Sequence, residues 1–192
     1  MFASRLISLS LFFMTFGIAA ASPAPKAAIA KRAGTSSDVQ AVFLTLKRST
    51  DSILPQIDAL VANGKASDAT ITPLANAVTA AINTASASLG AIPGPVSTES
   101  GPSKDEIAAL TAGIVTDIVT SFDGVQKKFP FHVPSLALLI IKIDLALKTL
   151  LVGVDFLILG LTGVVAKLLV GVAGLVQSLG FILFFTLLQL SI

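Results

Sequence analysis

The 192-residue chain has no cysteine, no tryptophan and no tyrosine, and it has a single histidine. Without cysteine it can form neither disulfides nor thiolate metal sites, and one imidazole cannot complete the usual zinc ligand sets. Only 12% of its residues are charged, about half of what is typical of globular proteins. Stability must therefore come mainly from apolar contacts, and we expect no metal and no cofactor.

The motifs that mark common catalytic sites are also missing. The sequence contains no Gly-x-Ser-x-Gly elbow, no phosphate-binding loop, no dinucleotide-binding glycine fingerprint and no His-Glu-x-x-His helix. His132 lies in a proline-bounded segment close to Lys127 and Lys128, where we expect a loop side chain without a chemical role. We therefore predict that the protein is not an enzyme, and we assign no catalytic, cofactor-binding or metal-binding residues.

The formal charge of +2 is unevenly distributed along the chain. Four of the thirteen basic residues lie in the first 32 positions, namely Arg5, Lys26, Lys31 and Arg32. The remaining residues carry nine basic and eleven acidic side chains, which gives a net charge of −2. A basic surface for nucleic acid is therefore not expected.

The first 21 residues have the pattern of a secretory signal peptide. A single arginine precedes an apolar run from residue 6 to 18, and alanines follow, so we place the cleavage after Ala21. A membrane anchor is the alternative, although the run is shorter than the roughly 20 residues of a span. Residues 22–32 form a Pro- and Ala-rich propeptide that ends at the dibasic pair Lys31-Arg32, unless that pair is simply part of a solvated linker. We expect a secreted protein, found in the cell wall and the medium.

Residues 33–128 carry three amphipathic helices and are called the head below. The first spans residues 37–63, and the second begins at Thr72-Pro73 and ends at Gly90. A Pro-, Gly- and Ser-rich linker covers residues 90–102, after which Ser103 and Glu106 form a capping box that opens the third helix. The apolar stripes are Val39, Phe43, Leu46, Thr50, Ile53, Ile57 and Leu60 in the first helix, and Ile71, Leu74, Val78, Ala81, Ala85 and Leu89 in the second.

An elbow of prolines and phenylalanines at residues 129–134 leads to an apolar segment, residues 135–192, called the tail below. Between residues 133 and 192, forty positions are Ala, Val, Ile, Leu or Phe, and only five are charged. At about 2 kcal/mol per side chain, burying all forty would contribute on the order of 80 kcal/mol before opposing terms are subtracted. Asp144, Lys148, Asp155 and Thr162 fall on one narrow polar strip, with Asp144 and Lys148 spaced as a favourable ion pair. The tail residues expected to meet an apolar surface are Leu150, Val154, Phe156, Leu168, Val172, Phe181, Phe184 and Phe185.

Three interpretations of the tail remain open. It drives self-association or adsorption at apolar interfaces, since large exposed apolar surfaces normally mark interaction sites. Alternatively, residues 168–192, which carry no charge, span a membrane and anchor the protein there. In the third interpretation the tail is a core that the three amphipathic helices wrap, and a related bundle could carry lipid. All three share an all-α fold, a helical hairpin plus a third helix followed by long, glycine-containing hydrophobic helices.

The layout as a whole resembles a family of small, cysteine-free proteins secreted by mushroom-forming fungi. The resemblance is carried by the signal, the dibasic pair, the polar first half and the apolar second half, and most sharply by residues 56–63 and two Leu-Leu-Val-Gly-Val runs at residues 150–154 and 168–172. It implies a surface-active structural protein of the cell wall, linked to aerial hyphae and attachment, with apolar surfaces or wall components as partners. No site residues come with the resemblance. A hydrophobin is excluded, because that family has eight cysteines.

Overall fold

The backbone is helical almost throughout the computed structural model, which describes residues 34–99 and 101–189 and contains no named strand within those ranges. The prediction of an all-α fold is therefore confirmed. The helices are α1 (Ser36–Ala62), α2 (Asp68–Gly90), α3 (Lys104–Lys128), α4 (Leu136–Leu157), α5 (Leu161–Leu169), the 3-10 turn η1 (Val170–Val172), α6 (Ala173–Ser178) and α7 (Ile182–Leu188).

Three sequence predictions concern residues outside the described part of the chain. These are the signal peptide at residues 1–21 with its cleavage after Ala21, the propeptide at residues 22–32, and processing at Lys31-Arg32. They remain predictions.

Capping boxes open α1 and α3, the second as predicted. The Ser103 backbone N–H donates to Glu106 Oε2 at 2.7 Å, and the Glu106 N–H donates back to Ser103 Oγ at 3.2 Å. The hydrogen bond from the Ser103 backbone holds the pKa of the Glu106 carboxyl below its ordinary value. In α1, Thr35 and Asp38 make the equivalent pair. The side chains thus satisfy backbone donors that a helix start leaves open.

The predicted start of α2 is wrong by five residues. The helix begins at Asp68, where the Ser67 N–H donates to Thr70 Oγ1 at 3.0 Å, and Pro73 lies inside the helix instead of at its first position. The Thr72 hydroxyl is 3.1 Å from the Ser135 hydroxyl, so it links α2 to the start of α4. A Thr-Pro pair looks like a helix start locally, but here a polar pair further upstream provides the cap.

The buried side of α1 follows a true helical period and departs from the predicted stripe in its second half. After Thr50, the buried residues of α1 are Leu54, Ile57 and Val61, so Leu54 and Val61 take the places predicted for Ile53 and Leu60. The predicted stripe alternated spacings of four and three residues, an average of 3.5. A straight helix has 3.6 residues per turn and drifts about 20° per heptad, so the buried position moves by one residue.

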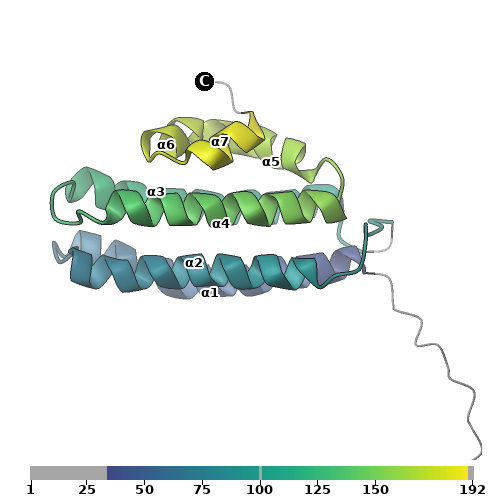
Figure 1. Ribbon diagram of the computed structural model, residues 1–192, viewed down its shortest axis with the longest axis horizontal. Coiled ribbons are helices and arrows are strands. Elements are labelled where there is room, and N and C mark those ends of the chain that lie inside the picture. Colours follow the sequence, from purple (N-terminus) through teal and green to yellow (C-terminus); the bar gives the residue numbers. More distant parts are fainter. Residues whose placement is uncertain (1–33, 100, 190–192) are drawn as a thin grey trace, which may run out of the picture. The chain divides into compact units, whose positions relative to one another are not determined.

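The helices stack in three layers (Figure 1). The first layer holds α1 and α2, the second α3 and α4, and the third α5, α6 and α7. Among the described residues, α4 packs most extensively on α2 and also contacts α5 and α7, while α3 packs on α1, α5 and α6. The middle layer is thus covered on two sides. This explains why eleven residues are buried in each of α3 and α4, against eight in α1 and six in α2.

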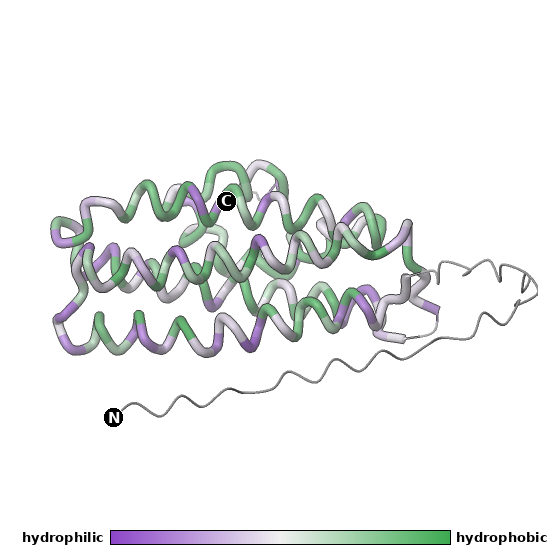
Figure 2. Tube along the Cα trace, turned by 60° about the horizontal axis from the view of Figure 1, so that its bottom comes forward, coloured by the Kyte–Doolittle hydropathy of each residue, from purple (hydrophilic) through white to green (hydrophobic). Residues whose placement is uncertain are grey.

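Head and tail share one hydrophobic core. The buried cluster runs without a break from Val39 in α1 to Leu188 in α7, and the described residues belong to one unit, Lys31–Ile192. Hydrophobic positions recur along the helices of both segments (Figure 2). The tail is therefore not a separate block beside a soluble head in this structure. Most of its apolar side chains are packed inside, as in the third interpretation.

Only α4 is a long helix in the tail. After it, Gly160 and Gly180 adopt left-handed backbone conformations with φ of 75° and 83°, and η1 separates α5 from α6. Residues 168–189 consequently form several short pieces instead of one continuous membrane-spanning helix. By length and composition alone, two helical stretches could cross a membrane, Lys104–Lys128 and Leu161–Ser178, and over half of the window in the first is buried in the fold.

Candidate apolar interaction surface

The outer face of α4 exposes a row of large apolar side chains. Its members, called the α4 ridge, are between 51% and 69% exposed: Leu138, Ile141, Leu145, Val152 and Phe156. Their spacings place them on one side of the helix, over about 27 Å at 1.5 Å per residue. Of the large apolar side chains exposed in the described ranges, all but Leu44 come from residue 131 onward. Apart from Leu44 and Phe131, the exposed large apolar side chains therefore belong to the tail, although most of the tail's apolar side chains are packed inside.

A threonine occupies the gap in the ridge between Leu145 and Val152. The Thr149 hydroxyl donates to the Leu145 carbonyl at 2.8 Å, so its polar group is satisfied within the helix. Its methyl group can then contribute to an apolar face. The ridge is thus continuous along α4.

Asp144 and Asp155, on the inner side of α4, hold the third layer in place. Asp144 is only 2% exposed, and its carboxylate accepts the N–H groups of Leu183 at 2.9 Å and Phe184 at 2.8 Å. These are the second and third residues of α7, whose own N-cap, Phe181, has no capping side chain. Asp155 likewise accepts the Thr162 N–H at 2.9 Å and the Thr162 hydroxyl, at the start of α5. Carboxylates are favourable at helix N-termini, where free N–H groups and the helix dipole meet them.

The predicted ion pair on the polar strip of α4 is therefore wrong. Asp144 does not form an ion pair with Lys148 in the described part of the chain, because its carboxylate faces inward to α7. Asp144 and Asp155 bind backbone groups of the third layer. The i,i+4 spacing on α4 was a local argument, and the partners of Asp144 lie about 40 residues away in sequence.

Both ends of α4 are anchored to the head. At its start, Ser135 donates to Asp68 Oδ1 through its backbone N–H at 3.2 Å and its hydroxyl at 2.8 Å. Just beyond its end, the Lys104 ammonium donates to the Leu159 carbonyl at 2.9 Å. The Val96 N–H of the linker donates to the Leu157 carbonyl, also at 2.9 Å. The ridge is thus carried on a helix that is fixed at both ends.

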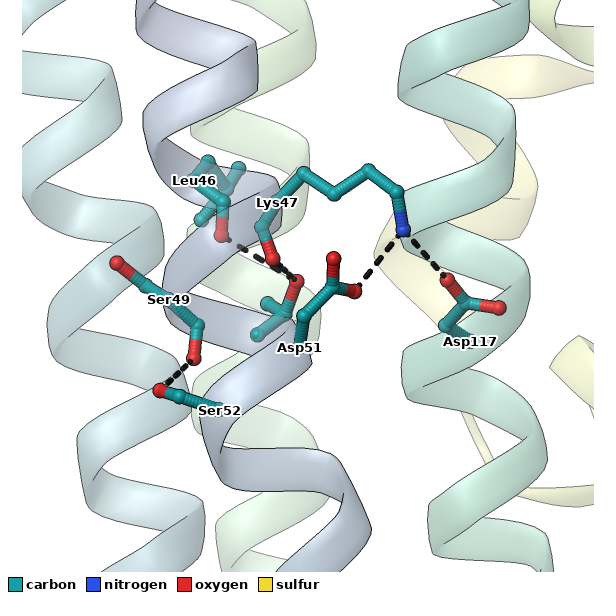
Figure 3. Close-up of polar contacts among 7 residues, drawn as sticks. Leu46, Lys47, Ser49, Asp51, Ser52 and Asp117 are labelled. Atoms are coloured by element: carbon teal, nitrogen blue, oxygen red, sulfur yellow. Dashed lines mark hydrogen bonds and ion pairs between the residues drawn. The ribbon is translucent and has the colours of Figure 1, made fainter.

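Charged side chains are unevenly distributed over the helices. Seven occur in α3, five in α1 and four in α4, whereas α2 has only Asp68, and α6 and α7 have none. Lys47 links α1 to α3, since its ammonium contacts Asp51 of its own helix at 2.9 Å and Asp117 of α3 at 3.5 Å (Figure 3). The hydrogen bond to Asp51 raises the pKa of the Lys47 ammonium. In Figure 1, α2, α4 and α7 lie toward the viewer and α1 and α3 behind, so the two helices with the most charged residues lie on the far side.

The eight predicted surface residues of the tail divide into three groups. Leu150, Val154, Phe181 and Phe184 are core residues, between 0% and 2% exposed. Val172 and Phe185 are half-buried against the core. Phe156 and Leu168 are exposed, at 69% and 51%, and Phe156 is part of the α4 ridge. Four of the eight thus pack inside the protein and do not form its outer surface.

The sequence reasoning missed the other four ridge residues, Leu138, Ile141, Leu145 and Val152. It placed the solvent side of α4 at Asp144 and Asp155, and those carboxylates point into the protein. A usable signal was present at two exposed positions, since Thr149 fills the gap within the ridge and Lys142 borders it. Weighting them above the aspartates would have identified the outer face.

No group of three or more metal-ligating side chains is found among the residues that the structure describes. His132 lies in the loop after α3, with its ring edge-on to Phe129 at a centroid distance of 5.8 Å. The loop position is as predicted, and the absence of a chemical role stays a prediction. The α4 ridge is consequently the candidate functional feature of the fold.

Comparison with known proteins gives a match over part of the chain. No protein-family model matches the chain. A 77-residue stretch is 48% identical to "Fruiting body differentiation protein 16" from the mushroom-forming fungus Flammulina velutipes. The match covers 39% of this chain and 59% of that relative. The chain is thus similar, over part of its length, to a fungal protein named for fruiting body differentiation.

Proposed function

We propose that this is a secreted, non-enzymatic structural protein that coats or assembles at apolar interfaces of the fungal cell wall. The α4 ridge supports the proposal: five large apolar side chains lie half-exposed in a row on the outer face of α4. Contiguous exposed apolar patches normally mark interaction sites. The similarity to a fungal fruiting-body protein is compatible with a role in aerial growth or attachment.

The folded protein can act as an amphiphile without opening its core. Burying the exposed half of five large apolar side chains is worth on the order of 5 kcal/mol at about 2 kcal/mol per fully buried side chain. That energy favours reversible adsorption and is small beside the apolar contacts that hold the tail inside. The charged helices α1 and α3 would remain in water while α4 faces air, oil or an apolar solid.

Pendant-drop tensiometry tests this function by comparing a double substitution in the ridge with a leucine substitution elsewhere on the surface. The double substitution Leu145→Ser and Phe156→Ser removes about 2 kcal/mol of transferable apolar surface. We expect about 30-fold more protein to be needed for the same surface pressure. Leu44→Ser is the control, since Leu44 is exposed on the charged helix α1. Equal surface activity of the double variant and the unaltered protein, with both folded by circular dichroism, would refute the proposal.

A further inference from the structure

The α4 ridge is bordered by lysines on both of its long sides. At 100° per residue, Lys142 lies about 60° to one side of the ridge centre and Lys148 about 60° to the other. Lys142 is exposed and Lys148 is half-buried beside Leu183 and Leu187 of α7. Their flexible stems can lie along the apolar face while the ammonium groups reach outward.

The acids of the same segment only partly offset these lysines at the surface. Asp144 is buried against α7, and Asp155 is half-buried and accepts hydrogen bonds from Thr162. The accessible charges of residues 135–189 are therefore Lys142, Lys148, Lys167 and Asp155, a net charge of +2, and none of the three lysines makes an ion pair in the described ranges. Residues 34–134 carry six basic and nine acidic side chains, a net charge of −3. The apolar side of the protein is thus positive and the head is negative.

From this arrangement we propose that the α4 ridge docks on an anionic lipid surface, with Leu138 to Phe156 in the outer acyl region and Lys142 and Lys148 at the headgroups. The proposal rests on the proposed function and names the partner that the ridge prefers. Apolar burial combined with basic flanks is the pattern of helices that lie in the plane of a membrane interface. The acidic head would be repelled by the same surface, which orients the molecule with α4 inward.

A second copy of the chain fits the ridge less well. A two-fold contact between antiparallel α4 helices would have its axis near the ridge centre, between Leu145 and Thr149. Each Lys148 would then approach its own symmetry mate, and no exposed acid on the ridge could offset the repulsion. An anionic surface, by contrast, gains from every lysine.

Co-sedimentation with vesicles tests the proposal. The protein is mixed with phosphatidylcholine vesicles that either contain or lack 30% phosphatidylglycerol (about a third of the lipid, enough for a strong surface charge). We expect tighter binding to the anionic vesicles, a loss with added salt, and about a 25-fold weakening for Lys142→Gln with Lys148→Gln, at about five-fold per lysine. Lys127→Gln with Lys128→Gln, at the end of α3, is the matched control and should bind like the unaltered protein. All variants are purified in the same form, so their N-termini contribute equally.

Three results would overturn the inference. These are equal binding to both kinds of vesicle, equal weakening by the two lysine pairs, and a ridge-dependent dimer in analytical ultracentrifugation without vesicle binding. Tensiometry on the same samples separates this failure from failure of the proposed function. If the Leu145→Ser and Phe156→Ser variant loses surface activity while lipid charge has no effect, only the anionic partner is wrong.

Discussion

We expect Asp144→Ala to lower the free energy of unfolding by about 2–5 kcal/mol. The buried carboxylate accepts two N–H groups at the start of α7. Its removal leaves both donors without a partner, at about 1–3 kcal/mol each. A seven-residue helix is far too short to form without tertiary support, so α7 depends on this contact. Urea unfolding followed by circular dichroism measures the loss.

Two further variants make the Asp144 prediction specific. Asp144→Asn keeps one carbonyl oxygen and should lose about half as much stability. Asp51→Ala is the surface control, because its carboxylate is 53% exposed and its ion pair with Lys47 is worth about 1 kcal/mol at most. If Asp144→Ala costs no more than Asp51→Ala, the carboxylate does not hold the third layer.

Phe184→Ala destabilises the whole helical unit by about 3–5 kcal/mol. The Phe184 ring is 0% exposed and belongs to the cluster that runs from α1 to α7. Replacing it leaves a cavity in addition to the lost apolar transfer energy. Because head and tail share that cluster, amide hydrogen exchange should accelerate in α1 and α2 as well as in α7. Mass spectrometry of deuterated peptides reads out each helix separately.

Phe131→Ala is the matched control for this substitution. Phe131 lies in the loop after α3 and is 90% exposed, so its loss should change stability by less than about 0.5 kcal/mol. Faster exchange confined to α5, α6 and α7 in the Phe184 variant would mean that the third layer opens independently. Head and tail would then be separate cooperative units.

Features that depend on neighbouring residues could be predicted from the sequence. The Ser103–Glu106 capping box lies within four residues, and Asn63-Gly64 ends α1 as a Schellman motif, in which the Lys65 N–H donates to the Leu60 carbonyl at 2.9 Å. The second helix, α2, ends at Gly90, also as predicted. Apolar periodicity was sufficient to identify the first three helices and the all-α fold.

Features that depend on distant residues could not be predicted in this way. Asp68 binds Ser135 across 67 positions, and Asp144 binds α7 across about 40. Periodicity reports which side of a helix is apolar, but it does not say whether a lone carboxylate faces water or a helix start. In α4, apolar on nearly every side, that ambiguity decided which residues form the core and which form the ridge. From the sequence alone the tail had no evident packing partner, although most of its apolar side chains pack in the core.

Site-specific labelling tests whether the folded protein meets apolar surfaces through α4. The chain has no cysteine, so Leu145→Cys and Leu44→Cys each give a single attachment point for an environment-sensitive fluorophore. Spectra are recorded in solution and on oil droplets. We expect a large blue shift at position 145 and little change at position 44, with helicity retained. Equal shifts at both positions, or none at position 145 when the protein is adsorbed, would contradict this expectation.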